Sequence, residues 1–206
     1  TGREAALATE LAYGTLRGLG TYDEIIGACG DRAPGELDPP LRDAIRLGAH
    51  QLLRTRIPAH AAVSSTIDLV RLRVGPGPSR YANAVLRKVA GRTLDEWLAI
   101  VAPPKEEDPI GHLAVVHSHP RWIVNAFRDA LGGDLDETTA ALEADNARPR
   151  VALVARPGRC SPDELVAAGA ERAAYSPYGC YLTEGDPAEI PAVAEGRAAV
   201  QDEASQ

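Results

Sequence analysis

The most informative stretch of the sequence reads SRYANAVLRK and runs from Ser79 to Lys88. Its apolar residues, together with the next one along, recur at the spacing of one helix face: Ala82, Val85, Leu86 and Val89. The polar residues Arg80, Asn83 and Arg87 share the opposite face, since they are spaced i, i+3, i+7. The stretch therefore predicts an amphipathic helix that packs on other helices and presents a basic surface.

Helical signals continue on both sides of this stretch. We expect further helices over these ranges: 3–19, 22–28, 41–53, 63–74 and 136–145. Ser79 is expected to cap its own helix, and Thr93 opens another through a capping box. Asp108 and His119, each followed by proline, open two more, of which the second is expected to bury Trp122.

The period of the pattern changes near residue 150. A Val-rich run over 150–156 predicts a strand, and Ser161 caps a helix that ends at Gly169. A hairpin or bent strand over 173–183, a helix over 187–196 and a last strand over 197–202 follow. We therefore expect a mostly α protein, a helical bundle followed by a small α+β (ferredoxin-like) domain.

Composition and charge separate the two parts. The chain has 206 residues with 45% hydrophobic and 4% aromatic residues, which suits helices packed on helices. Residues 1–92 carry 13 Lys/Arg and 9 Asp/Glu, a net charge of +4, whereas residues 93–206 carry 9 and 20, a net charge of −11. A polyanionic ligand would therefore bind to the first part and not to the second. With neither a bilayer-spanning run nor a signal segment, we expect a soluble, cytoplasmic protein.

Several kinds of chemistry have no motif in the sequence. Neither GxGxxG nor a P-loop is present, and His112, His117 and His119 have no CxxC or HExxH partner for a metal. Cys29, Cys160 and Cys180 are predicted to be unpaired, non-catalytic thiols. We therefore predict no catalytic, cofactor or metal residue in this segment, which looks like a piece of a longer protein.

Three stretches of the first part resemble the NusB family of RNA-binding transcription factors. They are RLGAHQLL (46–53), RIPAHAAV (56–63) and SRYANAVLRK (79–88). Four more are similar to the RsmB (Fmu/Sun) family of 16S rRNA cytosine-C5 methyltransferases: Ala5–Arg17, His119–Trp122, Asp145–Pro149 and Val200–Gln206. The chain departs from that family near Ala155, where the family has an arginine.

The second resemblance implies a domain plan. Residues 1–92 are expected to form a NusB-like helical RNA-binding domain that lacks its first helix, residues 93–118 a helical linker, and residues 119–206 a small α+β pre-catalytic domain. In the family, the segment after Val200 leads into a methyltransferase domain that binds S-adenosylmethionine, which this chain does not contain.

The resemblance also points to site residues for 16S rRNA. We expect Arg80, Asn83 and Arg87 to contact it with Lys88 beside them, and Arg56 and His60 are weaker candidates. The alternatives are that the arginines are merely solvated and that Asn83 tethers a neighbouring loop. Gln201, Asp202 and Ser205 are expected to organise the junction with the absent domain and, in the complete protein, to touch its cofactor pocket. The alternative is that they serve domain packing alone.

Three functions remain open from the sequence. The first is the rRNA-positioning region of an S-adenosylmethionine-dependent rRNA methyltransferase, with no membrane or DNA partner. The second is a non-catalytic NusB-type RNA-binding transcription or antitermination factor. The third is a protein-interaction module, which the acidic second part would suit.

Overall fold

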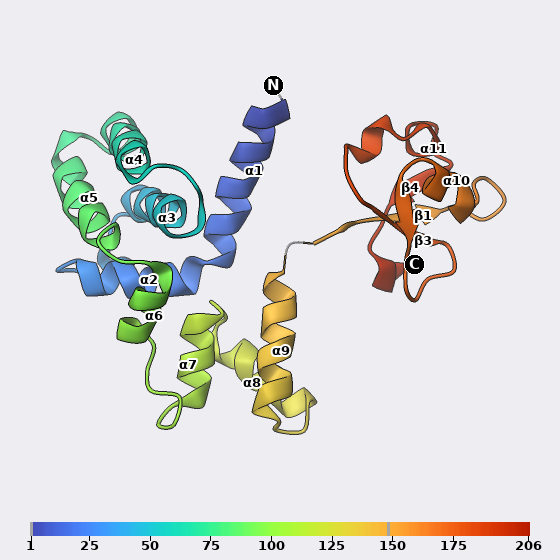
Figure 1. Cartoon of the computed structure of the whole chain (residues 1–206). Coiled ribbons are helices and arrows are strands. Elements are labelled where there is room, and N and C mark those ends of the chain that lie inside the picture. The colour runs from blue at the N-terminus through green and yellow to red at the C-terminus, as the bar shows by residue number, and fades with distance from the viewer. Residues whose placement is uncertain (1, 148) are drawn as a thin grey trace. The chain divides into compact units, whose positions relative to one another are not determined.

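The computed structural model describes residues 2–147 and 149–206, and the chain divides into two compact units, residues 1–146 and 147–206 (Figure 1). No helix in these ranges is long and apolar enough to cross a membrane. The first unit contains α1 Gly2–Arg17, α2 Leu19–Cys29, the 3-10 helix η1 Pro34–Glu36, α3 Pro39–Arg54, α4 Ala59–Arg73, α5 Pro76–Val89, α6 Leu94–Val101, α7 Pro109–Val116, α8 Arg121–Ala130 and α9 Leu135–Asn146.

The core of the first unit lies where α2, α3, α4 and α5 pack on one another. The apolar stripe predicted for α5 is its buried side: Ala82, Val85, Leu86 and Val89. A Cβ placed on Gly48 of α3 would lie 2.8 Å from the Leu86 side chain, so α3 and α5 meet at close range. The predicted helical bundle is confirmed.

A buried histidine joins α1 to this core. His50 of α3 is 2% exposed, and its Nδ1 lies 2.8 Å from the hydroxyl of Tyr22 in α2. A Cβ on Gly14 of α1 would overlap the His50 ring, and a Cβ on Gly18 would overlap Tyr22. Glycine at both positions therefore lets three chain segments meet around one hydrogen-bonded pair.

The helix starts agree with the sequence prediction at α6 but not at α5. The Thr93 hydroxyl accepts from the N–H of Glu96, whose carboxylate accepts the N–H of Thr93 at 2.7 Å, which is the predicted capping box. The prediction that Ser79 caps α5 is wrong, because the helix begins at Pro76 after Gly75, whose φ is 124°. Ser79 lies inside the helix and donates its hydroxyl to the Pro76 carbonyl at 2.6 Å. Proline fits the first helical turn, which favours the earlier start.

The helices α6 to α9 belong to the same compact unit. Thr21 of α2 donates its hydroxyl to the carbonyl of Val115 in α7 at 2.6 Å, and its N–H lies 3.3 Å from the Ser118 hydroxyl oxygen. The contacts divide the chain after Asn146, so the predicted boundary between residues 118 and 119 falls inside this unit. Contacts cross that boundary, because Asn146 donates its side-chain amide to the His117 carbonyl at 2.7 Å and Arg121 pairs with Asp108 at 2.6 Å.

A small second core lies among α7, α8 and α9. It is formed by Ile110, Leu113, Ala114, Val124 and Leu142. The prediction that α8 buries Trp122 is wrong, because this side chain is 69% exposed. Only a narrow stripe of α8 around Val124 is covered, since α7 and α9 pack on one side of the helix.

The second unit is a sheet with the strand order β2-β3-β1-β4, in which all neighbours are antiparallel. Helices connect β1 to β2 and β3 to β4, so this is the split β-α-β arrangement predicted as ferredoxin-like. Its elements are β1 Val151–Ala155, α10 Pro162–Ala167, β2 Ala170–Arg172, β3 Gly179–Leu182, η2 Pro187–Glu189, α11 Pro191–Ala194, β4 Ala198–Val200 and η3 Glu203–Ser205.

Pairing in this sheet sets its core. Leu153 at the centre of β1 faces Cys180 of β3 and Val200 of β4, and Leu153 and Cys180 are fully buried together with Leu165 of α10. The predicted hairpin over 173–183 is shifted in the structure, because its first strand lies earlier, at 170–172, and residues 173–178 form the connection.

The Gly14 contact gives a prediction for stability. We expect Gly14→Ala to lower the free energy of unfolding by about 1–3 kcal/mol, because the new methyl group must displace the buried His50 ring. Urea unfolding followed by circular dichroism measures it. The control is Gly77→Ala in the first turn of α5, where a Cβ meets nothing within 4 Å and helix propensity favours alanine. Equal stability of the two variants would contradict the close approach of α1 and α3.

Candidate nucleic-acid interface

The predicted basic face is the exposed side of α5. Burial of the four apolar residues of this helix against α3 and α4 turns Arg80 and Arg87 outward, and both are exposed. Asn83 lies between them and is partly exposed. No described residue accepts a hydrogen bond from the Asn83 amide, so the tether to a neighbouring loop, which was the structural alternative, has no partner in the described part of the chain.

A groove of about 490 Å³ runs between α4 and α5 and contains three of the predicted residues. His60 at the start of α4 and Asn83 and Arg87 of α5 line it. Val63 and Ile67 supply apolar surface in the same groove. The groove therefore combines guanidinium and amide donors with an apolar surface, a combination that suits an unpaired nucleotide.

Two of the predicted residues lie outside this groove. Arg80 is on the same exposed face of α5, two turns before Arg87, and Arg56 is exposed in the turn between α3 and α4. Both remain available as cations on the surface of the first unit. The structure therefore brings together His60, Asn83 and Arg87 and leaves Arg80 and Arg56 to contact a ligand that extends beyond the groove.

Lys88 has a structural partner. Its Nζ donates to the carbonyl oxygen of Cys29, the last residue of α2, at 2.8 Å. A cation at this position satisfies a carbonyl that the helix leaves free and interacts favourably with the helix dipole. Lys88 therefore ties the end of α5 to the end of α2.

Arg71 was missed by the sequence prediction and lines the groove. It lies in the last turn of α4, eleven residues after His60, which is three helical turns and therefore the same face. Its Nη1 lies 3.3 Å from Asp68 Oδ1, and both side chains are mostly exposed, so water screens this ion pair. The helical period of α4 was the signal that could have identified Arg71.

The segment after β4 folds onto its own sheet. Gln201 donates its side-chain amide to the Ser205 carbonyl at 2.7 Å, and Asp202 Oδ1 accepts the N–H of Ala204 at 2.9 Å. The N–H of Ser205 donates to the Asp202 carbonyl at 3.1 Å. The predicted junction residues Gln201, Asp202 and Ser205 are thus connected to one another, and they shape the turn η3.

Glu203, which the sequence prediction passed over, is the anchor of this segment. Its carboxylate accepts the hydroxyl of Tyr181 at 2.6 Å and the N–H groups of Ser176 and Tyr175. The hydrogen bonds from Tyr181, Ser176 and Tyr175 hold the pKa of Glu203 below its usual range. The chain end, β3 and the 173–178 connection are therefore held by one carboxylate.

The thiols have no activated character. Burial raises the pKa of Cys29, Cys160 and Cys180, so all three stay protonated at neutral pH. Within the described residues no group of three or more His, Cys, Asp or Glu could hold a metal ion. Arg148 of the Asp145–Pro149 stretch lies outside the described residues.

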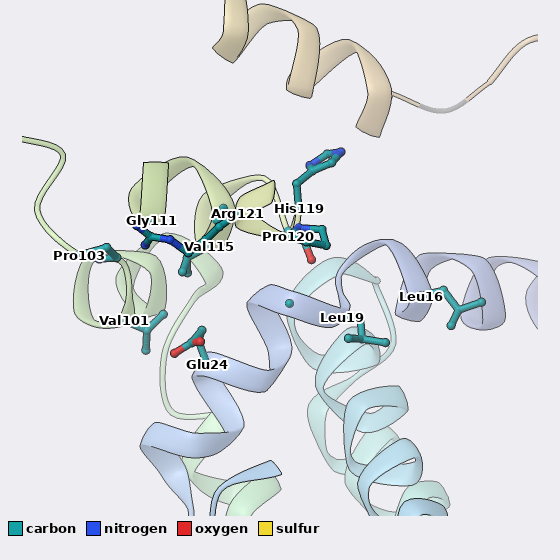
Figure 2. Close-up of a pocket in the computed structure, with 13 residues that line it drawn as sticks. Leu16, Leu19, Glu24, Val101, Pro103, Gly111, Val115, His119, Pro120 and Arg121 are labelled. Atoms are coloured by element: carbon teal, nitrogen blue, oxygen red, sulfur yellow. The ribbon is translucent and has the colours of Figure 1, made fainter. Parts of the chain in front are cut away.

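Figure 2 shows a recess of about 560 Å³ between the α1–α2 corner and the α7–α8 corner. Apolar residues such as Leu19, Val101 and Val115 line most of it, and Glu24 and Arg121 are its charged residues. His119 points away from it in Figure 2 and places its Nε2 2.8 Å from Asp145 of α9. The recess has one guanidinium group and no side-chain amide, whereas the α4–α5 groove has two guanidinium groups and the Asn83 amide.

Comparison with known proteins matches the NusB family model to residues 1–91. A candidate methyltransferase of two Mycobacterium tuberculosis strains is 48% identical over 206 residues, an alignment that covers 100% of this chain and 45% of that protein. The ribosomal RNA small subunit methyltransferase B of Pseudomonas putida is 32% identical over 211 residues, covering 99% of this chain and 46% of that protein. The chain therefore spans less than half the length of these relatives.

A crystal structure, that of PH0851, resembles this chain in fold. The TM-score is 0.69 at 20% sequence identity, and the match covers 97% of this chain and 45% of that one. At this identity the likeness concerns the fold alone. Because the match covers nearly all of this chain, a helical unit followed by a small antiparallel sheet also occurs in that protein.

The two adjacent cations of α5 give a prediction. Lys88→Met should lower the free energy of unfolding by about 1 kcal/mol, because the Cys29 carbonyl loses its donor. Arg87→Met, one residue earlier, should leave stability unchanged, since no described residue pairs with it. Chemical unfolding of both variants measures the difference. A destabilised Arg87→Met with an unaffected Lys88→Met would reverse the assignment.

The contacts of Glu203 give a second prediction. Glu203→Gln should speed hydrogen exchange at the Tyr175 and Ser176 amides and lower the melting temperature of the second unit, because glutamine offers one neutral acceptor oxygen where the carboxylate offers two charged ones. Since the folded pKa of Glu203 is depressed, its stabilisation is complete above the unfolded glutamate pKa and is lost as pH falls through the folded pKa.

The difference between wild type and Glu203→Gln should therefore shrink in acid. Exchange measured by NMR at neutral pH and near pH 3 tests this, with Glu184→Gln at an exposed position as control. A difference that persists undiminished in acid would mean that the carboxylate charge is not what holds the connection.

Proposed function

Because residues 1–91 belong to the NusB family and the whole chain aligns with ribosomal RNA small subunit methyltransferase B proteins, we propose that it is the rRNA-recognition region of such a methyltransferase. The observation that supports this most directly is the exposed basic face of α5 beside the α4–α5 groove. Arg80 and Arg87 bind backbone phosphates, and Asn83 contacts a base edge or a sugar hydroxyl. The RNA is 16S rRNA, and the protein acts in the cytoplasm.

The parent activity explains why such a region is needed. Methylation at C5 of cytosine begins with addition of a cysteine thiolate at C6, and it requires that the base leaves its stack. That chemistry recognises one base and not the surrounding RNA. The task of this chain's residues is therefore to hold the phosphate backbone and local shape so that one cytosine is presented.

The methyl donor of the parent reaction is S-adenosylmethionine, which carries an adenosine and a charged amino-acid group. A pocket for it needs several polar partners, and the recess in Figure 2 is lined mostly by apolar side chains. The lining of this recess therefore does not suit the cofactor, and we assign it no site on this chain. We propose that the helical unit binds RNA and that the α+β unit, residues 147–206, precedes the catalytic domain. In the second unit the turn formed by Gln201, Asp202 and Ser205 leads toward that domain.

A non-catalytic NusB-type RNA factor is the second candidate. The match of the NusB family to residues 1–91 supports it, and the alignment of the remaining residues with methyltransferases favours the first. A complementation assay separates the two, because only a methyltransferase region supports rRNA methylation when joined to a catalytic domain of a relative.

RNA binding tests the proposed interface. We expect the chain to bind a hairpin of small-subunit rRNA and to lose affinity between about 50 and 200 mM salt, because counterions are released when arginines meet phosphates. Arg80→Glu/Arg87→Glu should weaken binding by about tenfold or more and flatten the salt dependence. Fluorescence anisotropy with labelled RNA measures both.

The control for this experiment carries the same change of charge elsewhere. Lys105→Glu/Arg159→Glu reverses two exposed cations that lie outside α4 and α5. It should bind nearly as tightly as the wild type. Equal losses in both double variants would mean that net charge and not the α5 face governs binding, and absence of binding by the wild type at low salt would remove the proposal.

A further inference from the structure

A second polar cleft, of about 310 Å³, lies in the first unit apart from the α4–α5 groove. Arg17 at the end of α1 and Arg54 at the end of α3 line it, and His50 lies one helical turn before Arg54. Glu10, Ser118 and Asn146 complete its polar lining. Two helix ends thus bring two guanidinium groups and an imidazole to one cavity.

The imidazole in this cleft has an unused nitrogen. His50 is 2% exposed, and its Nε2 is buried without a hydrogen-bond partner. The nearest carboxylate oxygen, Glu10 Oε1, is 4.0 Å away, which is too long for a hydrogen bond. A buried polar nitrogen without a partner is unfavourable, so a ligand that hydrogen-bonds to it in this cavity would be stabilised.

The position of the proton on this imidazole depends on its other contact. Burial raises the pKa of Tyr22 to about 12, so the phenol keeps its proton, and its oxygen lies 2.8 Å from His50 Nδ1. Burial also lowers the pKa of His50, which keeps the ring neutral. If the phenol donates to Nδ1, the ring proton is on Nε2, and the cleft receives a donor.

The remaining groups of the cleft are mostly donors as well. Among the described residues neither Arg17 nor Arg54 has a carboxylate partner, whereas Arg46 is paired with Asp23 at 2.6 Å. The Ser118 oxygen accepts the N–H of Thr21 and leaves its hydroxyl proton free. Glu10 opposes this set with a single charge, and its side chain is half exposed and can turn to water.

We propose that this cleft binds a phosphate group through Arg17, Arg54 and His50. Phosphate oxygens accept from both guanidinium groups and from the Nε2–H, which satisfies the buried nitrogen. The same chemistry fits a phosphate of the RNA backbone, in which case the site rests on the proposed function, or free inorganic phosphate. Gly14 and Gly18 also line the cleft and leave room for its buried groups, because a Cβ at Gly14 would overlap the His50 ring and a Cβ at Gly18 would overlap Tyr22.

Inorganic phosphate titrated into the full chain tests the site itself. In chloride-matched buffer, NMR should show phosphate-dependent shifts of the His50 ring and of the Arg17 and Arg54 side chains. Arg17→Gln/Arg54→Gln, checked for an unchanged fold by circular dichroism, should bind phosphate at least about tenfold more weakly. Glu10→Gln should bind more tightly, because one repelling charge is removed. Lys105→Gln/Arg159→Gln, with the same loss of charge, should match the wild type.

A second experiment, RNA binding measured in phosphate-free buffer, identifies the source of the phosphate. If Arg17→Gln/Arg54→Gln weakens RNA binding and flattens its salt dependence while the α5 face is intact, the ligand is an RNA phosphate. If only inorganic phosphate is affected, the ligand is the free anion, and the site stands without the proposed function. If only the prediction for Arg80→Glu/Arg87→Glu is contradicted, the proposed phosphate site is unaffected. No phosphate-dependent shift in the wild type, or equal phosphate affinity in wild type and Arg17→Gln/Arg54→Gln, overturns the proposal.

Discussion

The geometry of the first unit depends on a neutral imidazole that is buried where three helices meet. His50 lies against Gly14 of α1 and within hydrogen-bond distance of Tyr22 of α2. Burial keeps both groups uncharged, which matters because an ionised group at this depth would lose its hydration. Any side chain larger than hydrogen at Gly14 would have to displace the His50 ring or move α1 relative to α3.

Helix α2 connects this buried contact to the rest of the unit through further hydrogen bonds. Tyr22 fixes it against α3, and the adjacent Thr21 bonds the carbonyl of Val115 in α7. At its other end the Cys29 carbonyl receives Lys88 of α5. One helix therefore sets the position of α3, α7 and the end of α5 by polar contacts, while the apolar core supplies the bulk of the stabilisation.

The sequence predicted what local patterns determine and missed what tertiary contacts determine. The stripe of α5 and the capping box at Thr93 need only the helical period and one cap, and both were confirmed. Whether Trp122 is buried depends on how much of α8 its neighbours cover, which no local pattern states. For the candidate site, the face of α5 was predictable, whereas the bond of Lys88 to Cys29 required the fold. The helical period of α4 could have placed Arg71 on the same face as His60, but only the fold shows that this face borders α5.

The distribution of ion pairs argues for where a polyanion binds. Beyond residue 92, several arginines already have a carboxylate at bonding distance, as Arg172 has in Asp163 and Arg121 in Asp108. Such an arginine must give up its partner before it can bind a phosphate. Arg80 and Arg87 have no carboxylate partner among the described residues, so they exchange only water and counterions for RNA. Residues 93–206 have a net charge of −11, so long-range electrostatics favour residues 1–92 as the place where the proposed RNA ligand binds.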